Sequence, residues 1–294
     1  MDLLFATHIL NAVLMMAIPI LLALFLKRRF KHSWVLFFSG VVGFIVSQLG
    51  HIPFNFLLTL FFQRGILPAP PEAYSLLVNA IILGLSAGLW EELVRYGTMR
   101  WWIGKNVRTW SQALFFGNGW GGIEAIILGG LALFAFFQLL AMRDIDLAGL
   151  VPAAQLELAR QQIENYWSMP WTASLIGAYE RLWALVIQIA LTVMVLQAFR
   201  RGKFLWVWLA VAWHALIDAL AVYITVTWGI FPSQAVVTIT GLISLGVIFA
   251  LRQPEPVEQP DLPPEPLPIP DASLLAVQPE PEPTLDKLDD TRYN

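Results

Sequence analysis

The stretch that decides the fold is Leu89-Trp90-Glu91-Glu92-Leu93-Val94-Arg95-Tyr96. It places two adjacent carboxylates, and an arginine one helical turn later, inside a segment that is otherwise apolar enough to span a bilayer. A charged side chain at membrane depth costs roughly 2.5 kcal/mol or more, and such residues usually face the interior of a helical bundle. We therefore expect this stretch to mark a functional site, for which the rest of the chain supplies partners.

The composition indicates a membrane protein. Of the 294 residues, 57% are hydrophobic and only 13% are charged, whereas a soluble domain carries about 25% charged residues. We predict an all-α polytopic bundle of about seven transmembrane helices in a lipid bilayer, with no nucleic-acid partner. The chain has no cysteine, which excludes disulfides and thiolate metal ligands.

Seven apolar segments are long enough to cross a bilayer, which takes about 20 residues. They are residues 5–26, 34–62, 74–96, 110–142, 172–199, 204–225 and 230–251. The second segment is long enough to require a tilt or a break, and a break would come at Pro53 because proline removes a backbone donor. The glycine-rich residues 117–122 interrupt the fourth segment and suit close helix packing, which would bring Glu124 up to Glu91. Residues 153–165 have the pattern of a short amphipathic surface helix.

Lysine and arginine residues alternate between the two sets of loops. Eleven bases lie in one set of loops, and only Arg64, Arg143 and Arg160 lie in the other. Cytoplasmic loops carry the excess of such residues. We therefore predict a multi-pass protein of the plasma membrane with its N-terminus outside and its C-terminus in the cytoplasm.

The end of the chain differs from the rest. Residues 1–252 are predicted to form the transmembrane bundle, and residues 253–294 a disordered, proline-rich acidic cytoplasmic tail. These last 42 residues hold eleven prolines and ten acids, and such a composition cannot bury enough apolar surface to fold. The tail is interpreted as a solvated tether, with a docking site for a partner as the alternative.

Eight ionisable residues lie on four of the predicted helices. Glu91 and Arg95 are spaced i, i+4 and can form an ion pair, whereas Glu92 points about 100° away. His214 and Asp218 have the same i, i+4 spacing, and a carboxylate beside an imidazole can fix its tautomer. Because packing does not need so many charges, we expect a buried polar chamber. The eight residues are Glu91, Glu92, Arg95, Glu124, Glu180, Arg181, His214 and Asp218.

Three of these motifs, in this order, resemble the CPBP (CAAX-protease-like) intramembrane proteases. The pattern of that family is a Glu-Glu pair with a following Arg, then Phe-x-x-x-His, then His-x-x-x-Asn/Asp. Here the motifs are Glu91-Glu92 with Arg95, Phe116 with Trp120, and His214 with Asp218. The closest resemblance is to the YhfC branch, on residues 119–125, Glu180-Arg181, Ser47-Gln48 and His51-Ile52-Pro53. The resemblance covers roughly residues 35–220.

The resemblance implies hydrolysis of a transmembrane peptide by a water that is activated with or without a metal. Glu91 would be the general base, with Glu92 and Arg95 as its supports and Glu124 and Glu180 as further members of the site. His214 would hold the water or a metal, and Asp218 would be its neighbour or an oxyanion contact.

Two histidines that the resemblance implies are replaced, by Trp120 and Gln188. An indole N–H donates but cannot ligate a metal, and catalytic zinc normally has three protein ligands. A zinc site would therefore consist of His214 with glutamates, and His51 is a further candidate imidazole.

Three functions stay open from the sequence. The first is an intramembrane endopeptidase of the glutamic or metallo type, and the second is a non-catalytic protein of the same fold that binds a membrane peptide or partner protein. The third is a proton-coupled transporter that uses the carboxylates as a relay. A transporter predicts internal repeats, and the two halves of the chain show no convincing similarity.

Overall fold

The computed structural model describes residues 3–104 and 107–254, which form helices and turns and no strand. Seven of these helices are long and apolar enough to cross a membrane. They are α1 (Leu3–Phe30), α2 (Trp34–Gln63), α3 (Ser75–Gly97), α4 (Trp110–Ala141), α6 (Ile176–Arg200), α7 (Leu205–Trp228) and α8 (Ile230–Ala250). The predicted polytopic all-α bundle is confirmed. The predicted tail lies outside the described residues, apart from its first two.

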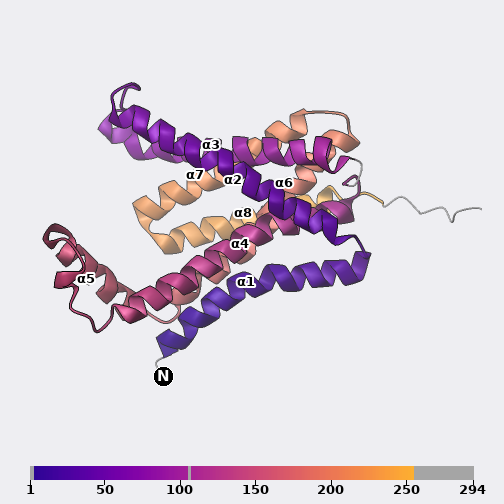
Figure 1. The fold of residues 1–294 in the computed structure, drawn as a ribbon. Coiled ribbons are helices and arrows are strands. Elements are labelled where there is room, and N and C mark those ends of the chain that lie inside the picture. The colour runs from indigo at the N-terminus through magenta and orange to yellow at the C-terminus, as the bar shows by residue number, and fades with distance from the viewer. Residues whose placement is uncertain (1–2, 105–106, 255–294) are drawn as a thin grey trace, which may run out of the picture. The chain divides into compact units, whose positions relative to one another are not determined.

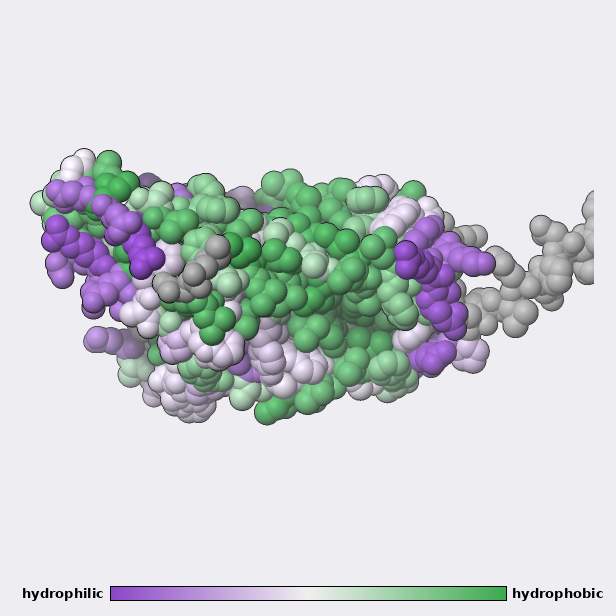
Figure 2. All heavy atoms as spheres, turned by 90° about the horizontal axis from the view of Figure 1, so that it is seen from below, coloured by the Kyte–Doolittle hydropathy of each residue, from purple (hydrophilic) through white to green (hydrophobic). Residues whose placement is uncertain are grey.

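The seven spans run back and forth through the bundle (Figure 1). The N-terminus and α5 (Ala153–Ser168) lie at one end, and the connections α1–α2, α3–α4 and α6–α7 lie at the other. The loops with most of the bases therefore share one end, the basic end of the bundle. Figure 2 shows a face that is hydrophobic across its middle and hydrophilic at both ends, as a bilayer requires.

Neither Pro53 nor the glycine-rich run breaks its helix. α2 continues through Pro53 as one helix of 30 residues, and α4 continues through the glycine-rich run as one helix of 32 residues. Water is absent from the hydrocarbon core, so backbone groups must bond within the protein, and a continuous helix meets that need even where proline or glycine would end it in water. The amphipathic surface helix is confirmed as α5, which has no buried residue.

Glycines set how closely α4 packs against its neighbours. A Cβ on Gly119 would clash with the carbonyl oxygen of Phe37 in α2, and a Cβ on Gly117 would lie 2.8 Å from Thr192 Oγ1 in α6. The predicted role of these glycines in close packing is therefore confirmed.

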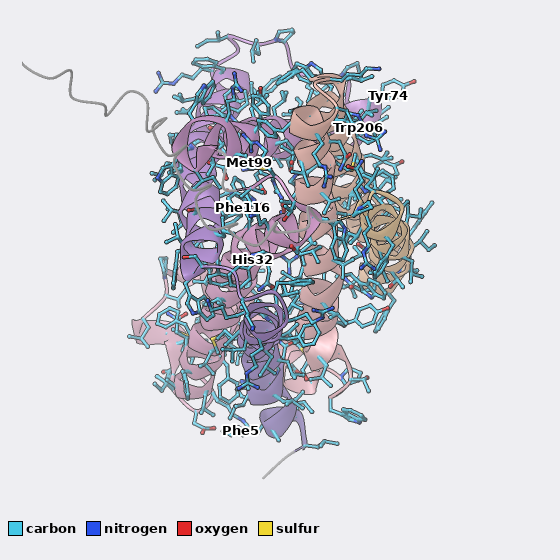
Figure 3. All side chains as sticks on the ribbon, turned by 90° about the vertical axis from the view of Figure 1, so that its right-hand side faces the viewer. Phe5, His32, Tyr74, Met99, Phe116 and Trp206 are labelled. Atoms are coloured by element: carbon cyan, nitrogen blue, oxygen red, sulfur yellow. The ribbon has the colours of Figure 1, made fainter. Side chains whose placement is uncertain are left out.

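α6 is the central helix of the bundle. Within its most apolar window 72% of the residues are buried, against 17% to 39% in the other spans, and it packs against α1, α4, α7 and α8. Met99 and Phe116 lie fully buried among the helices, whereas Tyr74 lies at the edge (Figure 3). Polar side chains on α6 are therefore placed to meet those of several other helices.

Candidate functional site: a charged chamber in the bundle

The glutamate pair of α3 is held against α7 by close packing. A Cβ on Gly88 would lie 2.7 Å from the carbonyl oxygen of Val211, so a larger residue at this position would push the two helices apart. This approach brings His214 of α7 to the carboxylate of Glu92, one turn after Gly88 on α3.

Glu92 is the centre of a buried ion-pair cluster. Its Oε1 lies 2.9 Å from His214 Nδ1, and its Oε2 lies 3.1 Å from Arg95 Nε. On the other side of the imidazole ring, His214 Nε2 lies 3.5 Å from Asp218 Oδ2. Each ring nitrogen thus faces a carboxylate, and an imidazole that is protonated on both nitrogens satisfies both. The expected pair of Arg95 with Glu91 is longer, at 3.8 Å, so Glu92 is the nearer partner of Arg95.

Glu91 lies in a cage of N–H donors from three helices. The indole N–H of Trp120 donates to Oε2 at 3.0 Å, and the amide of Gln188 donates to the same oxygen at 3.1 Å. The amide of Gln48 donates to Oε1 at 3.1 Å. A carboxylate has about four lone-pair sites, so Oε2 is filled and Oε1 keeps one site.

Trp120 and Gln188 also hold Arg95. The guanidinium lies 4.4 Å from the centroid of the Trp120 ring, and Arg95 and Trp120 are both fully buried. Arg95 donates from Nη2 to the side-chain oxygen of Gln188, from Nη1 to its backbone oxygen at 2.8 Å, and from Nη1 to Thr192 Oγ1 at 2.6 Å. These two residues therefore connect a buried cation to the buried carboxylate of Glu91.

A second ionic cluster lies on α4, α6 and α8. Arg181 Nη1 lies 2.6 Å from Glu124 Oε1, and its Nη2 lies 2.5 Å from Glu180 Oε1. The amide of Gln234 donates to Glu180 Oε2 at 3.0 Å. The amide of Gln188 donates to Glu124 Oε2 at 3.3 Å as well as to Glu91, so the two clusters form one network.

A cavity of about 120 Å³ lies between the clusters, and we call it the chamber. Five of the predicted site residues line it, namely Glu91, Glu124, Glu180, His214 and Asp218, and Arg181 lines it as well. Glu92 and Arg95 do not line it. This volume has room for several water molecules, but it is smaller than the roughly 300 Å³ at which pockets for organic ligands begin. In this conformation the chamber has room for water and not for a peptide segment.

The donor set around the chamber does not fit a metal ion. Glu91 Oε2 faces two N–H donors, and both nitrogens of His214 face carboxylates, so these atoms are already engaged. Within residues 3–104 and 107–254, no three His, Cys, Asp or Glu side chains lie close enough together to hold a metal. His51, the further candidate, bonds instead to Gln48, Ser86 and Asn55.

Some members of the network were not expected from the sequence. Gln188 was expected only as a poor metal ligand, Trp120 only as a residue unable to ligate, and Thr192 and Gln234 were not singled out at all. The sequence feature that identified the acids could also have identified these residues, since each is a polar side chain on an otherwise apolar helix. Gln188 and Thr192 are also spaced i, i+4, which puts them on one face of α6.

The fold and the site together define a polytopic membrane protein with a carboxylate-lined, water-sized chamber inside its bundle. The sequence model of the YhfC intramembrane metalloprotease family matches residues 14–240, and the chain belongs to this family. It is similar to the uncharacterized membrane protein YhfC of Bacillus subtilis (strain 168), with 30% identity over 228 residues that cover 72% of this chain and 82% of the relative. No solved structure is significantly similar to the chain.

Proposed function

We propose that this chain is a non-hydrolysing member of its intramembrane protease family. It has no metal centre, and it binds a transmembrane polypeptide without cutting it. One observation carries the proposal: Trp120 and Gln188 both donate to the same oxygen of Glu91. The resemblance implies a histidine at each of these two positions, at Trp120 from the second motif of the CPBP pattern and at Gln188 from the YhfC branch. An imidazole can present a lone pair to a metal, whereas an indole or an amide nitrogen presents only N–H donors.

The contacts of the glutamate pair also limit its use as a general base. Glu91 Oε2 already accepts two hydrogen bonds, so it keeps no lone pair for a proton from water. Glu92 is fully buried between Arg95 and His214 and does not line the chamber. Ion pairs and N–H donors within the network hold both carboxylates, as they would in a structural core.

Metal-free hydrolysis is the second candidate, and one observation favours it. Glu91 Oε1 accepts a single hydrogen bond, from Gln48, and Glu91 lines the chamber. In this account Oε1 takes a proton from a chamber water, and the oxygen of that water attacks the carbonyl carbon of a peptide. The peptide C–N bond then breaks, and the proton passes from Glu91 to the leaving nitrogen. The chamber would have to widen before a peptide could enter.

The setting that we propose is the plasma membrane, with the N-terminus outside and the basic end in the cytoplasm. The polypeptide partner would reach the chamber from within the bilayer, and the chamber would have to widen to admit it. Both statements rest on the loop charges and on the family to which the chain belongs.

Photo-crosslinking in native membranes tests whether a polypeptide is bound. A photoreactive amino acid at Ala221, which lines the chamber, is expected to capture a polypeptide. The control position is Leu131, a 55% exposed residue of α4, which is expected to capture lipid only. Equal capture of polypeptide at both positions, or at neither, contradicts the proposal.

Profiling of protein N-termini in the same membranes tests hydrolysis. Cells with the wild type and with Glu91→Gln are expected to yield the same set of membrane-protein fragments. A fragment that needs Glu91 and vanishes in Glu91→Gln would exclude the non-hydrolysing account and support the metal-free one.

A further inference from the structure

A large apolar groove lies outside the chamber, on the other face of α3. Its volume is about 800 Å³, and its walls come from α2, α3, the π-helical turn η2 (Thr98–Trp102) and the start of α7. The lining includes Val46, Trp90 and Leu93 but none of the residues that line the chamber. Because its walls are apolar and carry no charged side chain, the groove suits a hydrocarbon chain.

The groove reaches the level at which the bilayer meets water. The π-helical turn η2 extends α3 at the basic end and leaves Trp101 78% and Trp102 55% exposed beside the groove. Tryptophan is enriched at membrane–water interfaces, where the ring lies among the head groups. The end of the groove at η2 is therefore expected to lie near lipid head groups.

A basic cavity of about 340 Å³ adjoins this end of the groove. Its lining includes Arg100, Arg108 and Phe199, and it shares Tyr96 and Phe204 with the groove. The Tyr96 ring stacks on Phe199, with 4.9 Å between centroids, and meets the Phe204 ring edge-on at 5.1 Å. The apolar groove and the basic cavity thus meet at one aromatic cluster.

The two arginines of the basic cavity lack a local counter-charge. As far as the structure describes the chain, no acidic residue lines this cavity. Arg108 lies 4.3 Å from the centroid of the Phe199 ring and donates to the backbone oxygen of Val107 at 2.6 Å. Burial lowers the pKa of Arg108, and the positive charge of Arg100 lowers it further. An anion between the two guanidinium groups would relieve this repulsion.

We propose that the groove and the basic cavity together bind one phospholipid with an anionic head group. An acyl chain lies in the groove beside Leu93, and the phosphate lies between Arg100 and Arg108. The site requires an amphiphile, since it joins an apolar channel to a paired cationic site at the depth of the head groups. The bound lipid covers the face of α3 that turns away from the glutamate pair.

Native mass spectrometry of the purified full chain tests this site by titration with phosphatidylglycerol, phosphatidylcholine or inorganic phosphate. The wild type is expected to retain one phosphatidylglycerol with higher affinity than phosphatidylcholine. Each basic group near a membrane surface contributes about 1 kcal/mol to the binding of anionic lipid, so Arg100→Gln/Arg108→Gln is expected to weaken binding about 30-fold. The matched control is Arg28→Gln/Arg29→Gln, which removes the same charge at the same end and is expected to bind as the wild type does.

Two further variants keep the test decisive if the double variant fails to fold. Arg100 is exposed, so Arg100→Gln alone is expected to fold and to weaken phosphatidylglycerol binding about fivefold. Val46→Trp is expected to fill the groove and to weaken the binding of lipid while leaving both arginines in place. Equal affinity for the two lipids, equal losses in the arginine variant and its control, or displacement of the lipid by inorganic phosphate alone would overturn the proposal.

Discussion

At the scale of single residues, Trp120 performs two tasks with one side chain. Its indole N–H donates a hydrogen bond to the buried carboxylate of Glu91, and its ring packs against the buried guanidinium of Arg95. A histidine in this place could perform the first task or hold a metal, but its smaller ring would cover less of Arg95. Trp120 therefore links a buried carboxylate to a buried cation through one side chain.

The hydrogen bond from Trp120 to Glu91 is expected to contribute measurably to stability. Removing a hydrogen bond to a charged group costs about 1.5–3 kcal/mol, so Trp120→Phe should lower the thermal midpoint of the protein in detergent. Trp183→Phe is the matched control, because among the described residues the indole N–H of Trp183 has no hydrogen-bond partner. If both variants melt at the same temperature, the bond to Glu91 does not stabilise the fold.

The residues of the site were only partly predictable from the sequence. Glu91, Glu124, Glu180, His214 and Asp218 were expected because charges in apolar helices are costly, and the structure places all five around one chamber. Their pairing was not predictable, since it depends on how the helices are rotated. Helix spacing alone paired Arg95 with Glu91, whereas the packing of α7 against α3 makes Glu92 the nearer partner.

At the scale of helices, α4 shows why backbone contact decides the position of the site. The bilayer supplies no hydrophobic force between helices, so close approach at small residues drives their association. Gly119 gives α4 its contact with α2, and Trp120 follows directly after it in the chain. The depth of Trp120 in the bundle is therefore tied to this contact.

The Gly119 contact predicts a large difference between two chemically identical substitutions. Gly119→Ala should destabilise the protein by about 1–3 kcal/mol, the usual cost of overpacking, because its Cβ would clash with the backbone of Phe37. Gly130→Ala on the same helix should be neutral or stabilising, since nothing lies within 4 Å of its Cβ. Urea or thermal unfolding of both variants measures the difference, and equal effects would refute the packing argument.

Helix boundaries and types were predictable to different degrees. Hydropathy located all seven spans because each needs about 20 apolar residues. It could not foresee that α2 continues through Pro53, because proline would break this helix in water. The π-helical turn η2 was also not predicted, since a single wide turn leaves no periodic pattern in the sequence.

At the scale of the whole molecule, the arrangement of charges predicts a fixed orientation. The chain has no cysteine, so single cysteines report their side of the membrane without background. A membrane-impermeant maleimide applied to intact cells should label Gln155→Cys in α5 and not Lys203→Cys at the basic end. Permeabilised cells should label both. Labelling of Lys203→Cys alone in intact cells would reverse the proposed orientation.

The chamber and the apolar groove lie on two faces of one helix, α3. Its inner face carries the glutamate pair, and its outer face lines the groove. On the inner face, two N–H donors occupy Oε2 of Glu91, and this arrangement is the basis for the proposed non-hydrolysing function. The central claim is therefore that the N–H donors around Glu91 exclude a metal ion from the chamber.

Zinc content tests this claim most directly. The wild type and a Trp120→His/Gln188→His variant are purified in the presence of zinc, dialysed, and measured by inductively coupled plasma mass spectrometry. Two imidazoles beside Glu91 form a ligand set that zinc accepts, so the double variant is expected to retain zinc and the wild type to retain none in stoichiometric amount. One zinc ion per wild-type chain, lost in Glu91→Gln, would contradict the account.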